Sequence, residues 1–230
     1  MTDGTASITG LLLALQHGDG QFPSGGFAFS GGLETLYSDG RVSSPESVSN
    51  FVTGQLKHRW GPGDRVALAH AYRGASDFNR VIAIDRNYHA LCLAQSLREG
   101  SCRNGRAFLG THARLEIVNA VEYQRLIGKG QAHGHLPVMQ GFVWRQAGLS
   151  EAEATAAAAH AFCMGFLSAA VRLGRLGHIQ AQRIRSGISE TMMEILSRQV
   201  PDDEPMAGFS PAADIAAMRH DEADVRLFAN

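Results

Sequence analysis

Histidine and aspartate residues are the side chains of this sequence best suited to hold a metal ion. His133 and His135 stand two positions apart in a glycine-rich stretch, and His17 and Asp19 form a second pair near the N-terminus. Two ligands make a weak site, because protein-bound zinc takes three or four ligands from the chain. Solvated or helix-capping histidines account for the same pattern, so we predict no metal-binding residue.

The stretch from Gly100 to Ala107, GSCRNGRA, is close to the phosphate-binding pattern G-x-x-x-x-G-K-[ST]. Arg106 replaces the lysine of that pattern, and Ala107 replaces the hydroxyl that binds magnesium. The segment also follows a helical pattern, whereas a phosphate-binding loop follows a strand. We therefore expect no nucleotide binding.

Other catalytic patterns are missing from the sequence. It contains neither the G-x-S-x-G nucleophile elbow nor the zinc-binding pattern H-E-x-x-H. Glu116 and Glu122 are isolated carboxylates in a helical pattern, and we interpret them as salt-bridge partners. The sequence thus predicts no catalytic and no cofactor-binding residue.

Composition restricts the class of protein. The 230 residues are 44% hydrophobic with a net charge of −1, so no basic field favours nucleic acid or an anionic membrane. The most apolar segment, residues 156–171, is shorter than the roughly 20 residues of a membrane span. The N-terminus lacks a signal-peptide pattern, and three cysteines without a C-x-x-C pair indicate reduced thiols in a cytoplasmic protein.

The elements that must position these residues are all predicted to be helical. Periodicity, caps and Gly/Pro positions indicate an all-α, single-domain bundle of roughly eight to ten helices. The first expected helix ends near Gly18. The others are expected over about 27–38, 45–59, 64–73, 77–97, 106–127, 138–147, 151–174 and 177–199. We expect breaks at Gly61-Pro62-Gly63 and Gly100, and a loop over 128–137.

The chain is predicted to divide near residue 200. Residues 1–200 form the helical domain, in which Ser150 and Glu153 make a capping box for a long, buried central helix. Residues 201–230 form an acidic, proline-flanked linker and a C-terminal tail that binds a partner. The alternative is a last helix that packs on its own core through Ile215, Met218 and Val225.

The stretch QHGDGQFPSGGFAFSGGLETL, residues 16–36, combines six glycines with aromatic side chains. On a helix over 27–38, one stripe holds Phe29, Leu33, Leu36 and Tyr37, and the opposite side holds Phe27, Gly31 and Glu34. We expect one face to be buried in the protein and the other to contact a partner. The alternative is that both faces are internal.

Five stretches resemble the UreF-type urease accessory proteins, in order and over nearly the full length. These are residues 16–36, REGSCRNGRAFL (98–109), HLPVMQG (135–141), SAAVRLGRLGHIQAQRI (168–184) and HDEADVRLF (220–228). The second stretch accounts for the apparent phosphate loop. Arg175 departs from the family pattern, which usually has proline at this position.

The resemblance implies an all-α protein without catalytic activity or cofactor. It implies an adaptor that bridges a UreD/UreH-type accessory protein and a UreG-type GTPase to apo-urease for GTP-dependent nickel insertion. A homodimer is compatible with the resemblance. Two alternatives remain open. One is a nickel carrier that uses His17, Asp19, His133 and His135, and the other is a metal- or cofactor-dependent helical enzyme that uses the histidine-rich loop and His160.

Partner-binding residues are expected in three groups, since aromatic and arginine side chains anchor many interfaces. Phe27, Ser30, Gly31 and Glu34 form the first group. Arg172 and Arg175 are cations that could face the GTPase. The tail supplies Arg226, Leu227 and Phe228.

Overall fold

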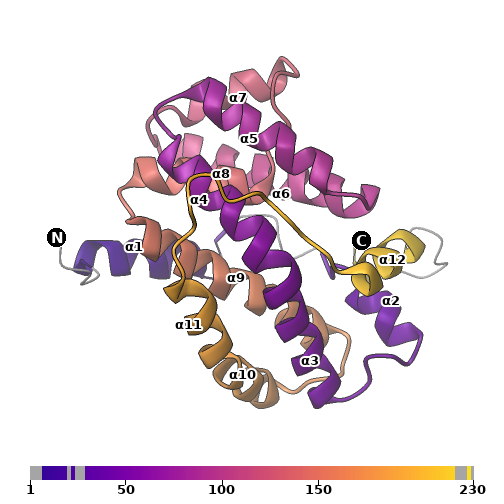
Figure 1. Ribbon diagram of the computed structural model, residues 1–230. Helices are drawn as coiled ribbons and strands as arrows, with labels where there is room; N and C mark the ends of the chain where they lie inside the picture. Colours follow the sequence, from indigo (N-terminus) through magenta and orange to yellow (C-terminus); the bar gives the residue numbers. More distant parts are fainter. Residues whose placement is uncertain (1–6, 20–21, 24–28, 221–226, 229–230) are drawn as a thin grey trace.

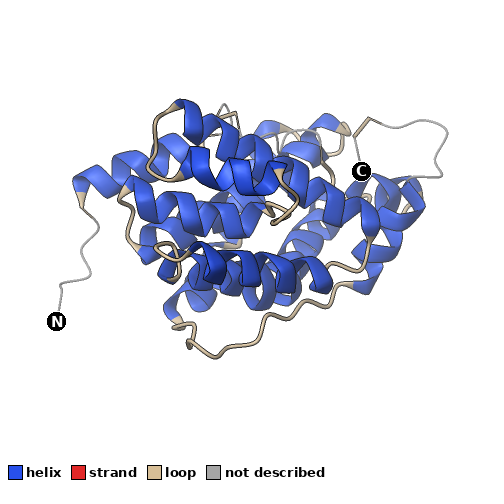
Figure 2. Cartoon of the chain, turned by 90° about the horizontal axis from the view of Figure 1, so that it is seen from above, coloured by secondary structure: helices blue, strands red, loops and turns tan. Residues whose placement is uncertain are grey.

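A computed structural model shows an all-α protein, which confirms the predicted fold class (Figures 1 and 2). The structure describes residues 7–19, 22–23, 29–220 and 227–228, and these contain no strand. The helices are α1 (Ile8–Gly18), α2 (Leu33–Ser38), α3 (Pro45–Gln55), η2 (Leu56–Asp64), α4 (Arg65–Arg73), α5 (Phe78–Leu91), α6 (Gln95–Arg114), α7 (Ala120–Gly128), α8 (Leu136–Ala147), α9 (Glu151–Arg172), α10 (His178–Gly187), α11 (Ser189–Ser197) and α12 (Pro211–His220).

Helix α9 is the central element, and α1, α3, α4, α8 and α10 pack against it (Figure 1). Its start is fixed by the predicted capping box, in which Ser150 accepts from the Glu153 amide and Glu153 accepts from the Ser150 amide. Buried alanines such as Ala154 and Ala158 allow the surrounding helices to approach closely. By length and composition α9 could cross a membrane, but 56% of its apolar window is buried inside the protein.

A second layer forms around α8, which packs on α4 and α6. The α8 side chains Met139, Phe142 and Val143 are fully buried, as is Trp144. Phe142 also contacts the ring of Tyr123 from α7, with 4.8 Å between ring centroids. This layer is rich in large aromatic side chains, whereas the buried face of α9 is rich in alanine.

The predicted break at Gly61-Pro62-Gly63 is wrong. Helices α3, η2 and α4 follow one another without interruption, and the π-helix η2 contains Pro62. In an α-helix the carbonyl of His58 would accept from residue 62, but proline has no N–H to donate. A π-helical segment absorbs this mismatch, so the helix continues.

The segment between α11 and α12 packs on this π-helix and is called the strap, residues 198–210. The Phe209 amide donates to the His58 carbonyl at 3.0 Å, and the Ala207 amide donates to the Pro62 carbonyl at 2.9 Å. A side chain at Gly63 would lie 2.7 Å from the Ala207 oxygen, so only glycine lets the two backbones meet. Figure 1 shows the strap running across the continuous helical rod of α3, η2 and α4, called the α3–α4 rod, to α12.

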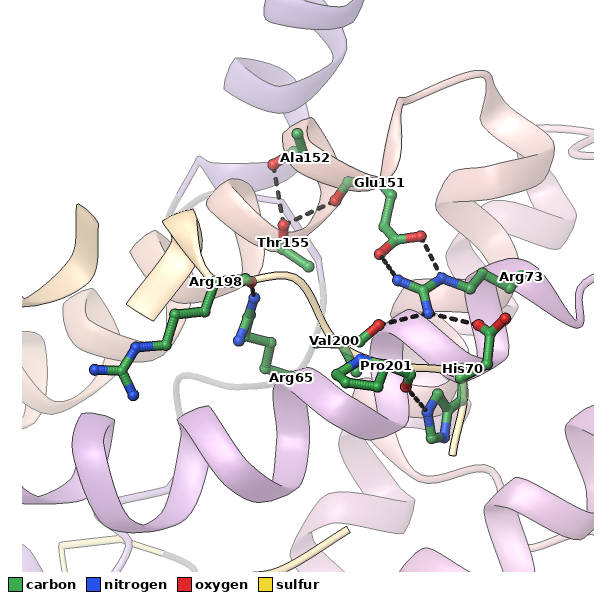
Figure 3. A network of polar contacts seen from close by, with 10 residues as sticks. Arg65, His70, Arg73, Glu151, Ala152, Thr155, Arg198, Val200 and Pro201 are labelled. Atoms are coloured by element: carbon green, nitrogen blue, oxygen red, sulfur yellow. Dashed lines mark hydrogen bonds and ion pairs between the residues drawn. The ribbon is translucent and has the colours of Figure 1, made fainter. Parts of the chain in front are cut away.

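Side chains of α4 hold the beginning of the strap (Figure 3). Arg73 makes two hydrogen bonds to the Glu151 carboxylate, at 2.8 and 2.6 Å, and donates to the Val200 carbonyl at 2.8 Å. Arg65 donates to the carbonyl of Arg198. Arg73 therefore joins α4, the first turn of α9 and the strap.

The predicted break at Gly100 is also wrong, because α6 is continuous from Gln95 to Arg114. Gly105 faces the loop before α8, where a side chain would meet the Gly134 oxygen and lie 2.6 Å from the Leu136 nitrogen. The glycines of the false phosphate loop thus serve helix packing. Further along, the predicted single helix over 177–199 is divided into α10 and α11 at Ile188.

Replacing Gly105 by alanine should destabilise the protein by about 1–3 kcal/mol, because the added methyl group overlaps backbone atoms that cannot rotate away. Gly110→Ala on the same helix is the matched control, since its nearest neighbour is a side-chain nitrogen 3.5 Å away. That control should be neutral or stabilising by up to about 1 kcal/mol. Urea unfolding of both variants measures the difference, and equal stabilities would contradict the packing role of Gly105.

Candidate functional site

The glycine-rich stretch does not form the predicted helix, because α2 begins at Leu33 rather than near residue 27. Gly31 and Gly32 have φ values of +59° and +87°, a left-handed conformation that favours glycine. The stripe proposed for Phe29, Leu33 and Leu36 is therefore wrong at its first position. Phe29 instead lies beneath Arg103 of α6, with the guanidinium carbon 5.2 Å from the ring centroid.

The same two glycines allow close contacts with other helices. A side chain at Gly31 would lie 2.7 Å from the Phe166 ring of α9, and one at Gly32 would lie 2.6 Å from the Ala213 oxygen of α12. The turn before α2 is thus packed between the central helix and the last helix.

Glu34 is buried on α2, and its carboxylate receives the C-terminal segment. One oxygen lies 2.7 Å from Nε2 of His220, and the carboxylate accepts from the amides of Leu227 at 2.7 Å and Phe228 at 3.2 Å. The Glu34 amide donates to Ser30 Oγ at 3.4 Å. A buried carboxylate needs such donors, because burial without them would be very unfavourable.

Arginine side chains complete this cluster. The guanidinium carbon of Arg172 lies 4.3 Å from the ring centroid of Phe228, and that of Arg175 lies 4.1 Å from the ring centroid of Tyr37. Both distances fit cation–π contacts. We call Glu34, Arg172, His220, Leu227 and Phe228 the tail cluster.

Helix α12 strengthens the attachment of the tail. It packs on α2 and α6 through Ala213, Ala216 and Ala217, which are buried. Arg219 makes two hydrogen bonds to the Asp39 carboxylate, at 2.6 and 3.1 Å. The last helix therefore packs on its own core, as the alternative interpretation had it.

The side chains that the alternative chose for this packing were different. Ile215 and Met218 are 55% and 46% exposed, and the small alanines make the contact instead. Val225 lies outside the described residues.

The structure brings together most of the predicted partner-binding residues. Ser30, Gly31, Glu34, Arg172, Arg175, Leu227 and Phe228 come from three separate stretches and lie in or beside the tail cluster; Phe27 and Arg226 lie outside the described residues. Sequence reasoning missed His220 as the partner of Glu34. Both stand in family-like stretches, but a pairing across 186 positions leaves no local signal.

The histidine-rich loop has a different set of neighbours from the one expected. His89 and Cys102, rather than His17 and Asp19, lie beside His135 within the described part of the chain. The Asp85 carboxylate is fully buried and accepts from the amides of Gly134 at 3.0 Å and His135 at 2.9 Å. This carboxylate fixes the shape of the loop.

His17 belongs to an aromatic cluster at the other end of α6. Its ring lies 4.8 Å from that of His112 and 5.1 Å from that of Phe22, between centroids. Burial, with a smaller contribution from His112, lowers the pKa of His17 to about 4. His112 itself donates from Nδ1 to the Phe108 carbonyl at 2.8 Å, and burial lowers its pKa as well.

A cavity of about 470 Å³ lies beside this cluster, lined by side chains of α1, η2, α6 and α9. Its polar wall includes Asp64 and Tyr88, whose hydroxyl donates to the carboxylate at 2.6 Å. Burial raises the pKa of Asp64, and Arg59 partly offsets that rise. These groups bind one another across the helices that carry them.

Fold and site together define an all-α protein in which buried polar clusters fasten distant segments, the C-terminus included, to a central helix. The model of the UreF family matches residues 42–188. The chain therefore belongs to the UreF family of urease accessory proteins, as its sequence stretches indicate.

Curated relatives extend the similarity to nearly the whole chain. The urease accessory protein UreF of Trichodesmium erythraeum is 35% identical, with 98% of this chain and 99% of that protein covered. UreF of Cereibacter sphaeroides is 33% identical over 95% and 97%. UreF of Actinobacillus pleuropneumoniae is 29% identical over 95% and 99%.

Glu34→Ala should leave His220 and two backbone amides without their acceptor and destabilise the protein by about 1–3 kcal/mol. The amides of Leu227 and Phe228 should then lose protection from hydrogen exchange. Glu122→Ala is the control, because that carboxylate forms an exposed pair with Arg125 worth at most about 1 kcal/mol. Unchanged exchange at Leu227 in the Glu34 variant would show that the carboxylate does not hold the tail.

Stability should fall as the pH is lowered from about 6.5, the usual value for histidine, to about 4, the value for His17. In that range the unfolded chain binds a proton that the folded protein excludes, so protonation favours unfolding. His17→Phe should reduce the slope of unfolding free energy against pH, while residual slope remains from His112 and the other histidines whose pKa burial lowers. Met193→Phe, an exposed substitution that removes no titrating group, should keep the wild-type slope, and a wild-type slope in His17→Phe would refute the assignment.

Proposed function

We propose that this protein is a non-catalytic helical adaptor in urease maturation. It binds a UreD/UreH-type accessory protein and a UreG-type GTPase and connects them to apo-urease for GTP-dependent nickel insertion. Membership of the UreF family supports a role in urease maturation. The bridging role rests on surfaces of this chain that are apolar and exposed.

The observation that carries the proposal is an apolar stripe on α1. Ile8, Leu11, Leu12 and Leu15 follow the spacing i, i+3, i+4, i+7 and are 80%, 52%, 62% and 62% exposed. The opposite side of α1 packs on α9, so the stripe is presented by a helix that is already anchored. A contiguous exposed stripe of this kind is typical of a protein–protein contact.

The tail cluster supplies a second surface in this proposal. Leu227 is half-exposed and Arg175 is exposed, so these side chains can contact a partner directly. Ser30 and Glu34 are buried and act by positioning the tail. Phe228 is buried as well and has the same positioning role. Phe27, Gly31, Arg172 and Arg226 complete the proposed contact region.

The cellular setting follows from the same proposal. Cys92, Cys102 and Cys163 are free thiols, which fits a reducing compartment. We expect the protein to act in the cytoplasm, without nucleic acid or membrane as partner. Two copies could also associate, which would place two GTPase subunits on one platform.

Reconstitution tests the proposed function. Apo-urease is incubated with nickel, GTP and the two partner proteins, with and without this chain, and urease activity is measured. We expect activation to depend on this chain and on GTP. Equal activation in its absence, or turnover of a substrate by the chain alone, would refute the adaptor role.

The double variant Leu11→Glu/Leu15→Glu should lose at least about tenfold in partner capture, because charges replace apolar contacts at the interface centre. Its unfolding free energy should change by no more than about 0.5 kcal/mol per site, since both side chains are exposed. Met193→Glu, at an exposed position of α11, is the control. Co-purification with the UreD/UreH-type protein measures capture, and full capture by the double variant would exclude the α1 stripe.

A further inference from the structure

Three side chains with metal-binding atoms meet where α5, α6 and the loop before α8 come together. His89 is in the last turn of α5, Cys102 is in α6, and His135 is the residue before α8. Their ligand atoms all lie within 4.8 Å of one another. Cys102 and His135 are buried, and His89 is half-buried at the edge of the protein.

The imidazole of His135 lies between the other two ligands, and Cys102 Sγ is alongside this ring, 3.7 Å from its Nδ1. His135 Nε2 lies 3.0 Å from His89 Nδ1 and 3.4 Å from Cys102 Sγ. Zinc with bonds of about 2.0 Å to nitrogen and 2.3 Å to sulfur would place tetrahedral ligand atoms about 3.3–3.6 Å apart. The separation of His135 Nε2 from Cys102 Sγ lies in this range, and that from His89 Nδ1 is about 0.3 Å shorter, so a small side-chain movement would admit such an ion.

Neighbouring groups support this orientation of His135. Its Nδ1 lies 3.1 Å from Ser101 Oγ, so an Nδ1–H can donate to the hydroxyl and leave the Nε2 lone pair free for an ion. Metal-binding histidines usually have such a partner on their other nitrogen. The buried Asp85 carboxylate fixes the backbone of the loop from the other side.

A neighbouring ring holds the third ligand in place. His133 stacks on His89 with 3.6 Å between ring centroids, which restrains the more exposed ligand. A thiol proton would leave to solvent when an ion binds, because the thiolate is the form that binds metals.

We propose that His89, Cys102 and His135 bind one Zn²⁺ ion in a tetrahedral site whose fourth ligand is water. Two imidazoles and a thiolate are a donor set that zinc favours. The ion would join α5, α6 and the start of α8. This inference is independent of the adaptor function and replaces the sequence-based expectation that no residue binds a metal.

The sequence could not have indicated this donor set. His133 and His135 attract attention by their spacing, but His89 and Cys102 lie 46 and 33 positions from His135. Only the packing of α5 on the loop, through Asp85, brings the three ligands together.

The purified full-length chain, stripped with a chelator, tests the site by calorimetry with Zn²⁺. We expect one ion per chain and a rise in the thermal unfolding midpoint with zinc concentration. With Co²⁺ as probe, a thiolate-to-cobalt charge-transfer band should appear and should be lost in Cys102→Ala. Cys102→Ala and His89→Ala should each weaken zinc binding by at least about tenfold.

Cys92→Ala and Cys163→Ala are the matched controls, and both should bind zinc as the wild type does. Circular dichroism and urea unfolding of the zinc-free variants verify that each is folded. Sub-stoichiometric binding, equal affinity in Cys102→Ala, or equal loss in Cys163→Ala would overturn the site. Tighter binding of Ni²⁺ than of Zn²⁺ in competition would overturn its assignment to zinc. None of these measurements involves urease, so they leave the adaptor proposal untouched.

Discussion

The buried carboxylate of Glu34 determines where α12 and the C-terminal residues Leu227 and Phe228 lie. A carboxylate out of water must be surrounded by donors, and here the donors are His220 and the amides of Leu227 and Phe228. To supply them, α12 must lie on α2, and the glycine turn before α2 must let it approach. The position of Arg172 over Phe228 follows from the same arrangement.

Asp85 has the same role on the other side of the molecule. It fixes the loop before α8 through three backbone amides, and the loop in turn presents His135 to α5 and α6. Both candidate binding regions are therefore organised by a buried acid that takes no direct part in the contacts proposed for it. Substitution of Glu34 or Asp85 would therefore alter a candidate binding region without replacing any residue that makes the proposed contacts.

Local signals predicted much of the fold. The helix before Gly18, the loop over 128–137, the helix that became α8 and the Ser150–Glu153 capping box were all expected, and the all-α class is confirmed. The helices expected over 77–97, 106–127 and 177–199 are interrupted at residues 92–94, at residues 115–119 and at Ile188. The other wrong predictions concern glycine and proline: residues 29–32, Gly61-Pro62-Gly63 and Gly100. In each case the sequence shows a poor helix former, but the outcome depends on what packs against it, and that neighbour is far away in the chain.

The candidate site shows the same limit. Residue types and family-like stretches indicated Ser30, Glu34, Arg172 and Phe228, yet as separate patches. Periodicity describes one element at a time, so it cannot pair Glu34 with His220, nor His89 with Cys102. Whether the tail-cluster residues contact a partner stays a prediction, because the contacts described are within the chain.

The strap has a consequence for how the polypeptide is made. The carbonyls of His58 and Pro62 are bonded by amides of Phe209 and Ala207, about 150 positions later in the chain. During synthesis the middle of the α3–α4 rod emerges from the ribosome long before those amides exist. The rod can therefore reach its final hydrogen bonding only after the strap has left the ribosome, so this region completes its folding late.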